Sequence, residues 1–302
     1  MSGTAVTIGA YDGVHLGHRA LLRELSDLAS ARGLSTVVVT FDRHPASVVR
    51  PDSAPLQLTD LEQKIELLEA CGIDRVLVIE FDRSRADESA EDFVTEVLVD
   101  TLEARLVVVG EDFHFGHGRK GNVALLTELG RQHDFEVVGA RLTGDGSEAV
   151  SSTRIRTLVA AGDVVAAAKL LGRPHEVRGP IVRGDGRGGP ELGFPTANFA
   201  IGDDIALPAD GIYAGYFTRA NGTVHQAAVS VGRRPTFYQP GTAPVLVEAY
   251  ILDFDGDLYG EESAGSFVQR LRGDHKFDSV GALVAQMRQD VADAQRVLSA
   301  DR

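Results

Sequence analysis

The sequence predicts an α/β N-terminal domain followed by an antiparallel β-barrel, because its hydrophobic pattern changes once along the chain. Up to about Leu171, short apolar segments alternate with helical patterns, which is typical of a parallel sheet covered by helices on both faces. After Leu171, a stretch with Gly and Pro precedes segments of period two, which is typical of antiparallel strands. We therefore expect a doubly wound domain over residues 1–172 and an antiparallel barrel domain with a terminal helix over residues 173–302.

Five apolar segments predict the strands of the parallel sheet. They span residues 5–8, 36–41, 75–79, 106–109 and 135–140. A helical pattern at about 16–29 follows the first strand. Thr59 and Glu62 have the spacing of a capping box at the start of another helix. Ser89 and Asp92 have the same spacing before a third. In such a sheet, ligands bind at the carboxyl ends of the strands.

Three segments with alternating hydrophobicity predict strands of the barrel. They span residues 211–218, 224–231 and 244–254, and the Asn221-Gly222 pair between two of them is a hairpin-turn signal. A last helix is expected over 279–298. Its apolar residues recur at three- and four-residue spacing, so we expect this stripe to face the core. The stripe consists of Val280, Leu283, Val284, Met287, Val291, Val297 and Leu298.

Composition excludes several classes of protein. The 302 residues are 43% hydrophobic and 25% charged, which is ordinary for a globular protein of two domains. A net charge of −14 argues against a general nucleic-acid binder, which needs a basic face. No apolar run is long enough to span a membrane and no signal-peptide pattern is present, so we expect a cytoplasmic protein. The lone Cys71 excludes an internal disulfide, and the oligomeric state is left open.

The stretch TIGAYDGVHLGHRALL, residues 7–22, places two of the nine histidines at the turn between the first strand and its helix. A helix N-terminus there favours an anion such as phosphate. His15 and His18 can donate hydrogen bonds to phosphate oxygens and, when protonated, offset negative charge. Gly17 leaves room for a nucleotide to approach. Two histidines at this spacing can also be ordinary surface or capping residues.

A second phosphate site is predicted where SSTRIR, residues 151–156, opens a helix. Ser or Thr there can be a simple N-cap. A cap needs one hydroxyl, however, and here three hydroxyls precede Arg154 and Arg156. Hydroxyls and guanidinium groups at a helix N-terminus are suited to phosphate, and this segment can face the histidine loop across the sheet's end.

These two motifs together resemble the nucleotidyltransferase module of the prokaryotic bifunctional riboflavin kinase/FAD synthetase family, within the HxGH superfamily. The resemblance implies that the phosphate of FMN attacks the α-phosphate of ATP, forming FAD and releasing pyrophosphate. It implies catalytic roles for His15 and His18 at the ATP phosphates. The ATP-binding residues that it implies are Gly9, Asp12, Gly17, Ser151, Ser152, Thr153 and Arg154.

The segment GEDFHFGHGRKG, residues 110–121, is similar to a further pattern of this family. The resemblance implies that Asp112 positions substrate or the metal-nucleotide, and that Phe113 and Phe115 contact flavin or pack the loop. Two positions of the nucleotidyltransferase module depart from the family, since Tyr11 stands where Phe is usual and Arg43 in TFDRHP stands where Pro is usual, and Asp274 in the later module stands where Glu is commoner.

The stretch RGDGRGGPELGFPTAN, residues 183–198, combines a Gly-rich segment with oxygen ligands. The glycines predicted to bind ATP are Gly184, Gly186 and Gly188. Alone, such a segment can be only a flexible hairpin loop. Thr196 and Asn198 supply hard oxygen ligands suited to Mg²⁺ held jointly with ATP phosphates.

Glu248 lies in a strand where alternation places it on the face opposite Val247. An exposed strand Glu is the default interpretation. However, LGFPTAN, LPADGIYAG, VGRRPTF, VEAYILDFDGDLYG and FVQRLRGDHKF occur in the order of the family's flavokinase module. This resemblance implies a six-stranded barrel in which Glu248 is the catalytic base, Thr196 and Asn198 hold Mg-ATP, and Arg272 and Asp274 lie on the flavin side.

The resulting hypothesis is a bifunctional enzyme with riboflavin, FMN, FAD and ATP as ligands and Mg²⁺ as cofactor. Riboflavin and ATP give FMN and ADP, and FMN and a second ATP give FAD and pyrophosphate. One alternative is an adenylyltransferase for another small phosphate with a regulatory barrel. Another is a non-catalytic flavin-binding or storage protein.

Overall fold

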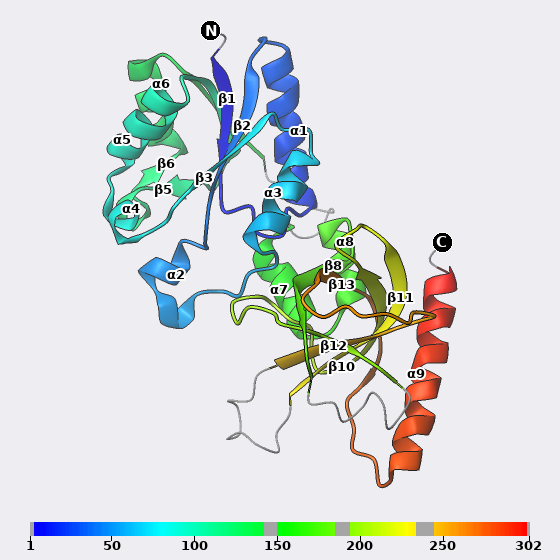
Figure 1. The fold of residues 1–302 in the computed structure, drawn as a ribbon. Coiled ribbons are helices and arrows are strands. Elements are labelled where there is room, and N and C mark those ends of the chain that lie inside the picture. The colour runs from blue at the N-terminus through cyan, green and yellow to red at the C-terminus, as the bar shows by residue number, and fades with distance from the viewer. Residues whose placement is uncertain (1–2, 142–149, 185–193, 234–244, 301–302) are drawn as a thin grey trace. The chain divides into compact units, whose positions relative to one another are not determined.

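The chain folds into two compact units, Met1–Ser152 and Thr153–Arg302 (Figure 1). The computed structural model describes residues 3–141, 150–184, 194–233 and 245–300. Within these ranges no helix is long and apolar enough to cross a membrane. The division between the units falls in the first turn of helix α7, so the boundary expected between residues 172 and 173 stays a prediction.

Five parallel strands form the sheet of the first unit, in the order β3-β2-β1-β4-β7. Their bounds are β1 Thr4–Ile8, β2 Ser35–Phe41, β3 Arg75–Ile79, β4 Ala104–Gly110 and β7 Glu136–Ala140. All five strands predicted from the sequence are confirmed. The chain leaves β1 and the neighbouring β4 toward opposite faces, so the edge between their carboxyl ends is the place where a doubly wound sheet binds ligands (Figure 1).

Helices cover both faces of this sheet, and each face has its own core (Figure 1). Val38 packs with Leu22 and Leu25 under α1 and α3, whereas Val39 packs on the other face with Val97 and Leu126. The helices are α1 Leu16–Ser30, α2 Ala46–Val49, η1 Pro51–Ser53, α3 Leu61–Glu69, α4 Arg83–Asp87, α5 Ala90–Phe93, the π-helix η2 Val94–Thr101, and α6 Val123–His133. A short hairpin, β5 His114–Phe115 and β6 Gly121–Asn122, encloses the 3₁₀ turn η3 His117–Arg119. Consecutive strand residues therefore face two separate cores, which confirms a doubly wound sheet with helices on both faces.

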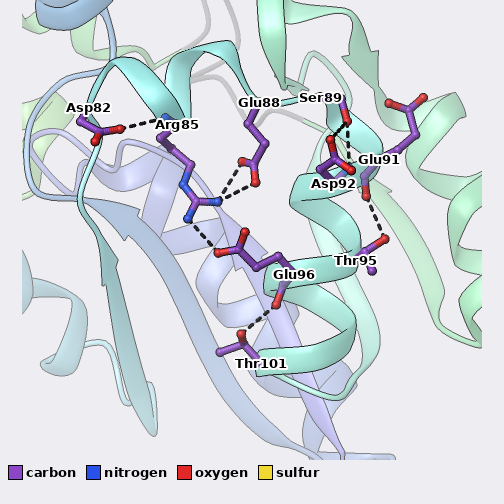
Figure 2. Close-up of polar contacts among 9 residues, drawn as sticks. All are labelled: Asp82, Arg85, Glu88, Ser89, Glu91, Asp92, Thr95, Glu96 and Thr101. Carbon is purple, nitrogen blue, oxygen red and sulfur yellow. Dashed lines mark hydrogen bonds and ion pairs between the residues drawn. The ribbon is translucent and has the colours of Figure 1, made fainter.

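One of the two expected caps is confirmed and the other is wrong. Ser89 caps α5 by accepting a hydrogen bond from the Asp92 amide at 3.0 Å (Figure 2). The cap of α3 is Asp60, which accepts from the Gln63 amide at 2.8 Å, and not Thr59. The Thr59 hydroxyl instead accepts a hydrogen bond from the backbone of Gly13, 46 residues away. A tertiary contact therefore replaces the local one.

Six strands close the barrel of the second unit, in the order β10-β11-β12-β9-β8-β13. Their bounds are β8 His175–Val182, β9 Ala197–Phe199, β10 Gly211–Thr218, β11 Val224–Arg233, β12 Val245–Ile251 and β13 Glu262–Gly273. The alternating pattern predicted β10, β11 and β12 and missed the other three. In β8, Gly179 and Pro180 are residues that usually end a strand, and β9 has only three residues.

Three helices belong to this part of the chain: α7 Ser152–Ala160, α8 Val164–Leu171 and α9 Val280–Ala300. The last helix is confirmed, but its apolar stripe is only partly buried. Asp290, Ala294 and Leu298 form its buried face, and Ala294 and Leu298 pack against Ala214 and Ala228 of the barrel. Val280 is 64% exposed, so its expected place in the core is wrong. The helix is packed through its C-terminal half, beyond the first turn.

Candidate functional site

The turn between β1 and α1 is held in an uncommon backbone conformation. Tyr11, Gly13 and Val14 have φ values of 49°, 81° and 39°. Positive φ is strained for Tyr and Val and persists where the surroundings hold it. Both side chains are buried in the core under α1. The burial of these two side chains thus fixes a sharp turn that ends at His15.

His15 is the N-cap of α1. Its Nδ1 accepts a hydrogen bond from the His18 amide at 3.2 Å, and its ring stacks on the His18 ring at 3.6 Å with an interplanar angle of 14°. Because Nδ1 accepts, the neutral ring of His15 carries its proton on Nε2. The capping interpretation of this histidine is confirmed, and the cap engages Nδ1.

His18 is an uncharged imidazole at neutral pH. Burial, together with the neighbouring His15, lowers its pKa well below 6.5. Its Nδ1 is buried and has no hydrogen-bond partner among the residues the structure describes. Hydrogen-bond donation, rather than positive charge, is therefore the role toward phosphate that this geometry supports.

The hydroxyl of Tyr11 lies in the core and not in the loop. It shares a 2.6 Å hydrogen bond with the Thr7 hydroxyl, and burial raises the pKa of the phenol. Its ring lies 5.0 Å from the His18 ring. A Cβ at Gly9 would lie 3.0 Å from the Tyr11 ring, so Gly9 gives this ring its space. The Tyr11 hydroxyl, which the usual Phe would lack, therefore bonds to strand β1.

Asp12 joins three segments at the carboxyl end of the sheet. Its Oδ1 accepts hydrogen bonds from the amides of Leu58 at 2.8 Å and Thr59 at 3.3 Å. Its backbone carbonyl accepts from the Ser152 hydroxyl at 2.9 Å. The buried carboxylate therefore positions the loop, and a direct contact of Asp12 with ATP stays a prediction.

The start of the SSTRIR segment lies against the histidine turn. A Cβ at Gly17 would lie 3.2 Å from the His15 ring and 3.3 Å from the Val150 carbonyl, which confirms that Gly17 leaves space. With the bond from Ser152, this brings the start of the SSTRIR segment, up to Ser152, against the histidine turn within the first unit. Ser151 directly precedes α7, and Thr153 and Arg154 continue its first turn. Their phosphate contacts stay predictions.

Lys64 is a site residue that the sequence reasoning missed. It is 4% exposed, and its Nζ donates to the Phe41 carbonyl at 2.7 Å, at the carboxyl end of β2. Burial lowers the pKa of this ammonium group, while the charges of Asp12 and Asp42 oppose that shift. The available signal was its place one turn before Leu68 on the buried face of α3.

The TFDRHP loop at the end of β2 carries an ion pair where the family usually has Pro. Arg43 donates to Asp42 at 2.8 Å, and the other carboxylate oxygen of Asp42 accepts from the Phe81 amide at 2.8 Å. Although burial acts to raise the pKa of Asp42, these hydrogen bonds hold it below its ordinary value. Arg43 therefore stabilises the loop by pairing with Asp42, which in turn binds the Phe81 amide.

The segment after β4 is held by side-chain packing. Phe113 stacks on the buried Phe115 at 5.3 Å, and both pack against the core beneath α5 and α6. Asp112 is exposed at the tip. The packing interpretation of the two aromatic rings is supported, and contact of Asp112 or Phe113 with flavin stays a prediction.

An ionic network supports this segment from the helical side (Figure 2). Arg85 donates to both carboxylate oxygens of Glu88, at 2.8 and 2.9 Å, and to Glu96 of η2 at 2.9 Å. The Glu88 carbonyl accepts from the His117 amide at 2.7 Å. Gly116 touches the backbone of Ala90 so closely that an added Cβ would lie 2.7 Å from its nitrogen. The loop that carries Asp112 is therefore anchored to α4 and α5.

In the second unit, two of the expected site residues, Glu248 and Asn198, lie in a row across the barrel strands. Glu248 of β12 is the direct partner of Asn198 of β9 on one side and of Ser230 of β11 on the other. Ile212 of β10 is the next partner in the row. Directly opposed residues share a face of the sheet, and these four are all half-buried between fully buried neighbours. The row therefore lies on the outer face of the barrel.

A pocket of about 160 Å³ opens beside this row. It is lined by Gly211, Ile212, Ser230, Val231, Gly232, Leu246, Glu248 and Asp274. The structure thus brings the predicted Glu248 and Asp274 to one cavity. Ser230 is a polar lining residue that the sequence reasoning missed, because it belongs to no charged or Gly-rich motif.

Gly184 and Asn198 are in close contact at the end of the row. A Cβ at Gly184 would lie 2.7 Å from both amide atoms of Asn198, so a side chain there would displace the Asn198 amide. The Asn198 amide donates to the Thr196 carbonyl at 3.2 Å, which orients its oxygen as an acceptor. Gly186 and Gly188 lie outside the described residues. One predicted glycine is thus placed beside the predicted metal ligands.

Arg272 is engaged with helix α9. It donates to both carboxylate oxygens of Asp290, at 2.8 and 2.7 Å, and both side chains are largely buried. Gln286 also donates to Asp290, at 2.9 Å. This bidentate pair ties β13 to α9. The geometry gives Arg272 a structural role, and its contact with flavin stays a prediction.

A helix N-terminus with two histidines on a doubly wound sheet and a carboxylate-lined pocket on a barrel together form the arrangement expected of a two-domain ATP-dependent transferase. Residues 1–154 match the family model of FAD synthetase, and residues 171–298 match that of riboflavin kinase. The bifunctional riboflavin kinase/FMN adenylyltransferase of Escherichia coli (strain K12) is 35% identical over 95% of this chain and 90% of its own. That of Listeria monocytogenes is 36% identical over 96% of this chain and 91% of its own. The chain belongs to the bifunctional riboflavin kinase/FMN adenylyltransferase family.

A solved structure shares this fold along its length. The crystal structure from Streptococcus pneumoniae described as a macrolide-efflux protein is similar with a TM-score of 0.85 and 31% identity. The match covers 98% of this chain and 95% of that one. The sheet and the barrel found here therefore recur in an experimentally determined relative.

Proposed function

We propose that this chain converts riboflavin to FAD in two ATP-dependent steps, one in each unit. The barrel transfers the γ-phosphate of ATP to riboflavin, giving FMN and ADP. The sheet unit transfers AMP from a second ATP to FMN, giving FAD and pyrophosphate. The observation that supports this best is that the models of both enzyme families match consecutive parts of one chain.

In the kinase step, Glu248 is the general base. Its carboxylate takes the proton of the terminal ribityl hydroxyl as that oxygen bonds to the γ-phosphorus, and the bond from phosphorus to the β-bridging oxygen breaks. Base assistance of this kind contributes about 10²- to 10⁴-fold. The position of Glu248 in the pocket, next to Asn198 in the strand register, supports this role.

Thr196 and Asn198 are the residues proposed to hold Mg²⁺ together with ATP. Their neutral oxygens suit a cation that keeps much of its water and shares its coordination with phosphates. Among the described residues no group of three or more His, Cys, Asp or Glu side chains could hold a metal by itself. When bound, Mg²⁺ would offset the charge of the phosphates. Gly184 leaves the Asn198 amide the space it occupies.

In the adenylyl step, the protein supplies alignment and hydrogen bonds. A phosphate oxygen of FMN bonds to the α-phosphorus of ATP, and the bond to pyrophosphate breaks, with no protein nucleophile. His15 and His18 donate hydrogen bonds to phosphate oxygens from the N-terminus of α1, where the helix dipole favours anions. The hydroxyls of the SSTRIR segment, which begins beside this turn, are proposed to bind the outer phosphates.

Direct assay of the purified chain tests both steps. Incubation with riboflavin, ATP and Mg²⁺, followed by chromatography of the flavins, should give FMN first and then FAD. Absence of both products would contradict the proposal and leave a flavin-binding protein. FAD formed only from supplied FMN would leave an adenylyltransferase whose barrel serves another purpose.

A further inference from the structure

Ser230 shares the kinase pocket with Glu248, and the reaction described above leaves it without a role. The two residues are direct partners on the neighbouring strands β11 and β12. Residues that oppose one another in this way have Cβ atoms about 4.5–5.5 Å apart, on the same face of the sheet. The Ser230 hydroxyl is therefore a neighbour of the proposed catalytic base.

The burial pattern of β11 shows that Ser230 faces the pocket and not the barrel core. Val229 and Val231 on either side are buried, whereas Ser230 is half-buried and lines the pocket. Since side chains alternate along a strand, the hydroxyl projects outward with Glu248. Packing in the apolar core does not explain a serine at this position. A polar ligand in the pocket would explain it, because the ligand would bind the hydroxyl.

The size of the pocket indicates which part of riboflavin it receives. Sites that enclose a whole drug-sized ligand usually measure roughly 300–1,000 Å³, and this pocket measures about 160 Å³. Its lining includes the polar side chains of Ser230, Glu248 and Asp274. A cavity of this volume and polarity suits a polyhydroxylated chain better than a tricyclic aromatic ring.

Gly232 keeps this side of the pocket open. It lines the cavity two residues after Ser230, on the same face of β11. A Cβ built there would meet no described atom within 4 Å, so packing against the rest of the described barrel does not require glycine. The space that a larger side chain at position 232 would occupy is therefore available to substrate.

We propose that the Ser230 hydroxyl binds a hydroxyl of the ribityl chain and thereby places the terminal hydroxyl beside Glu248. The proposal rests on the kinase function proposed above and names a specificity residue for it. Ser230 then selects flavins by their polyhydroxylated chain and makes no contribution to binding of the isoalloxazine ring.

Kinetics of the full-length Ser230→Ala variant test this assignment. With saturating Mg-ATP, the KM for riboflavin should rise about 3- to 12-fold, the effect of one neutral hydrogen bond, because the lost contact is made before and during the reaction. The kcat should stay within about threefold of wild type, since uniform binding affects KM. Ser230→Thr keeps a hydroxyl and should keep the KM within about threefold of wild type.

Lumiflavin, which has the ring but lacks the ribityl chain, separates a substrate contact from a distorted pocket. Its inhibition constant against riboflavin should be the same for wild type and Ser230→Ala within about twofold, because it has no group that this hydrogen bond would hold. Gln226→Ala changes a half-buried residue on the same face of β11 outside the pocket and is the matched control. This variant should leave the KM and the inhibition constant unchanged.

The outcomes separate this inference from the function on which it rests. An unchanged KM in Ser230→Ala, or a rise in the lumiflavin constant that matches the rise in KM, would overturn the role of Ser230 while FMN formation by wild type upheld the kinase. No FMN formation by wild type would overturn both. FMN formation by each variant with a kcat within about threefold of wild type verifies that the barrel is folded.

Discussion

The two candidate sites are built from different parts of their folds. In the sheet unit, the chemical groups lie in loops at the ends of parallel strands, and contacts between distant segments, such as Asp12 with Leu58 and Ser152, hold them. In the barrel, they lie on the strands themselves, and the register of Asn198 and Glu248 holds them. A loop site depends on tertiary hydrogen bonds, whereas a strand site depends on the backbone ladder.

The difference also appears in burial. His15 is almost completely buried and His18 half-buried, and burial lowers the pKa of His18. Glu248 is half-buried beside an open pocket. The comparison teaches that side-chain changes in the loop site disturb both structure and chemistry, whereas changes on the barrel face can remove chemistry alone.

Glu248→Gln should show the largest effect and the cleanest separation of the two sites. Loss of the base should lower kcat for FMN formation about 10²- to 10⁴-fold, because Gln keeps the size of Glu but takes no proton. Adenylylation of supplied FMN should stay within about twofold of wild type, since the change is made on the barrel face. Flavin chromatography measures both rates. Equal loss of both activities would show that the sites are not independent, and Glu262→Gln at an exposed strand position is the control.

His18→Ala should do the reverse. Removal of one preorganised donor at the phosphates should lower kcat for adenylyl transfer about 10²- to 10³-fold and spare FMN formation. His15→Asn refines the test because Asn is a good N-cap and cannot replace the imidazole donor. Retained thermal stability of His15→Asn with lost adenylylation would separate catalysis from capping. Wild-type adenylylation in both variants would contradict the site.

Lys64→Met should have a smaller effect on the same step. The change removes a buried positive charge from between Asp12 and Asp42, and kcat/KM for adenylyl transfer should fall roughly tenfold as the two loops lose this support. The free energy of unfolding should fall by about 1–3 kcal/mol, because the Phe41 carbonyl loses its donor and the buried carboxylate of Asp12 loses a nearby positive charge. Chemical denaturation and adenylylation assays measure the two quantities. The exposed Lys169→Met is the control, and a loss of stability that accounts for the loss of activity would make Lys64 purely structural.

The sequence predicted most of the sheet unit because its signals are local. Continuous apolar strands such as Arg75–Ile79 and the His-x-Gly-His turn can be found within a few residues of one another. The cap at Thr59 failed because its hydroxyl is held by Gly13, a contact that no short window contains. Lys64 was missed for a related reason, since only the fold places its ammonium group at the end of β2.

The barrel was harder to predict because its site depends on pairing. Period-two patterns identified β10, β11 and β12, but the register that sets Ser230 beside Glu248 joins positions 18 residues apart and has no sequence signature. Asp290 belongs to none of the sequence motifs, and only the structure shows that its carboxylate accepts hydrogen bonds from Arg272. The motif residues Glu248, Thr196 and Asn198 were found through resemblance to a family, and geometry added their neighbours.

The pH dependence of stability gives the smallest and most specific test of the loop site. The pKa of His18 lies well below 6.5 in the folded chain, so as pH falls below about 6.5 the unfolded chain binds a proton that the folded chain does not. Stability should therefore decrease with falling pH by up to about 1.4 kcal/mol per pH unit from this residue. Urea unfolding of wild type and His18→Gln between pH 7.5 and 5, with conditions chosen at about one-unit steps, measures the difference in slope. A shallower slope in His18→Gln than in the exposed His114→Gln control supports the buried neutral imidazole, whereas equal slopes would show that water reaches the ring.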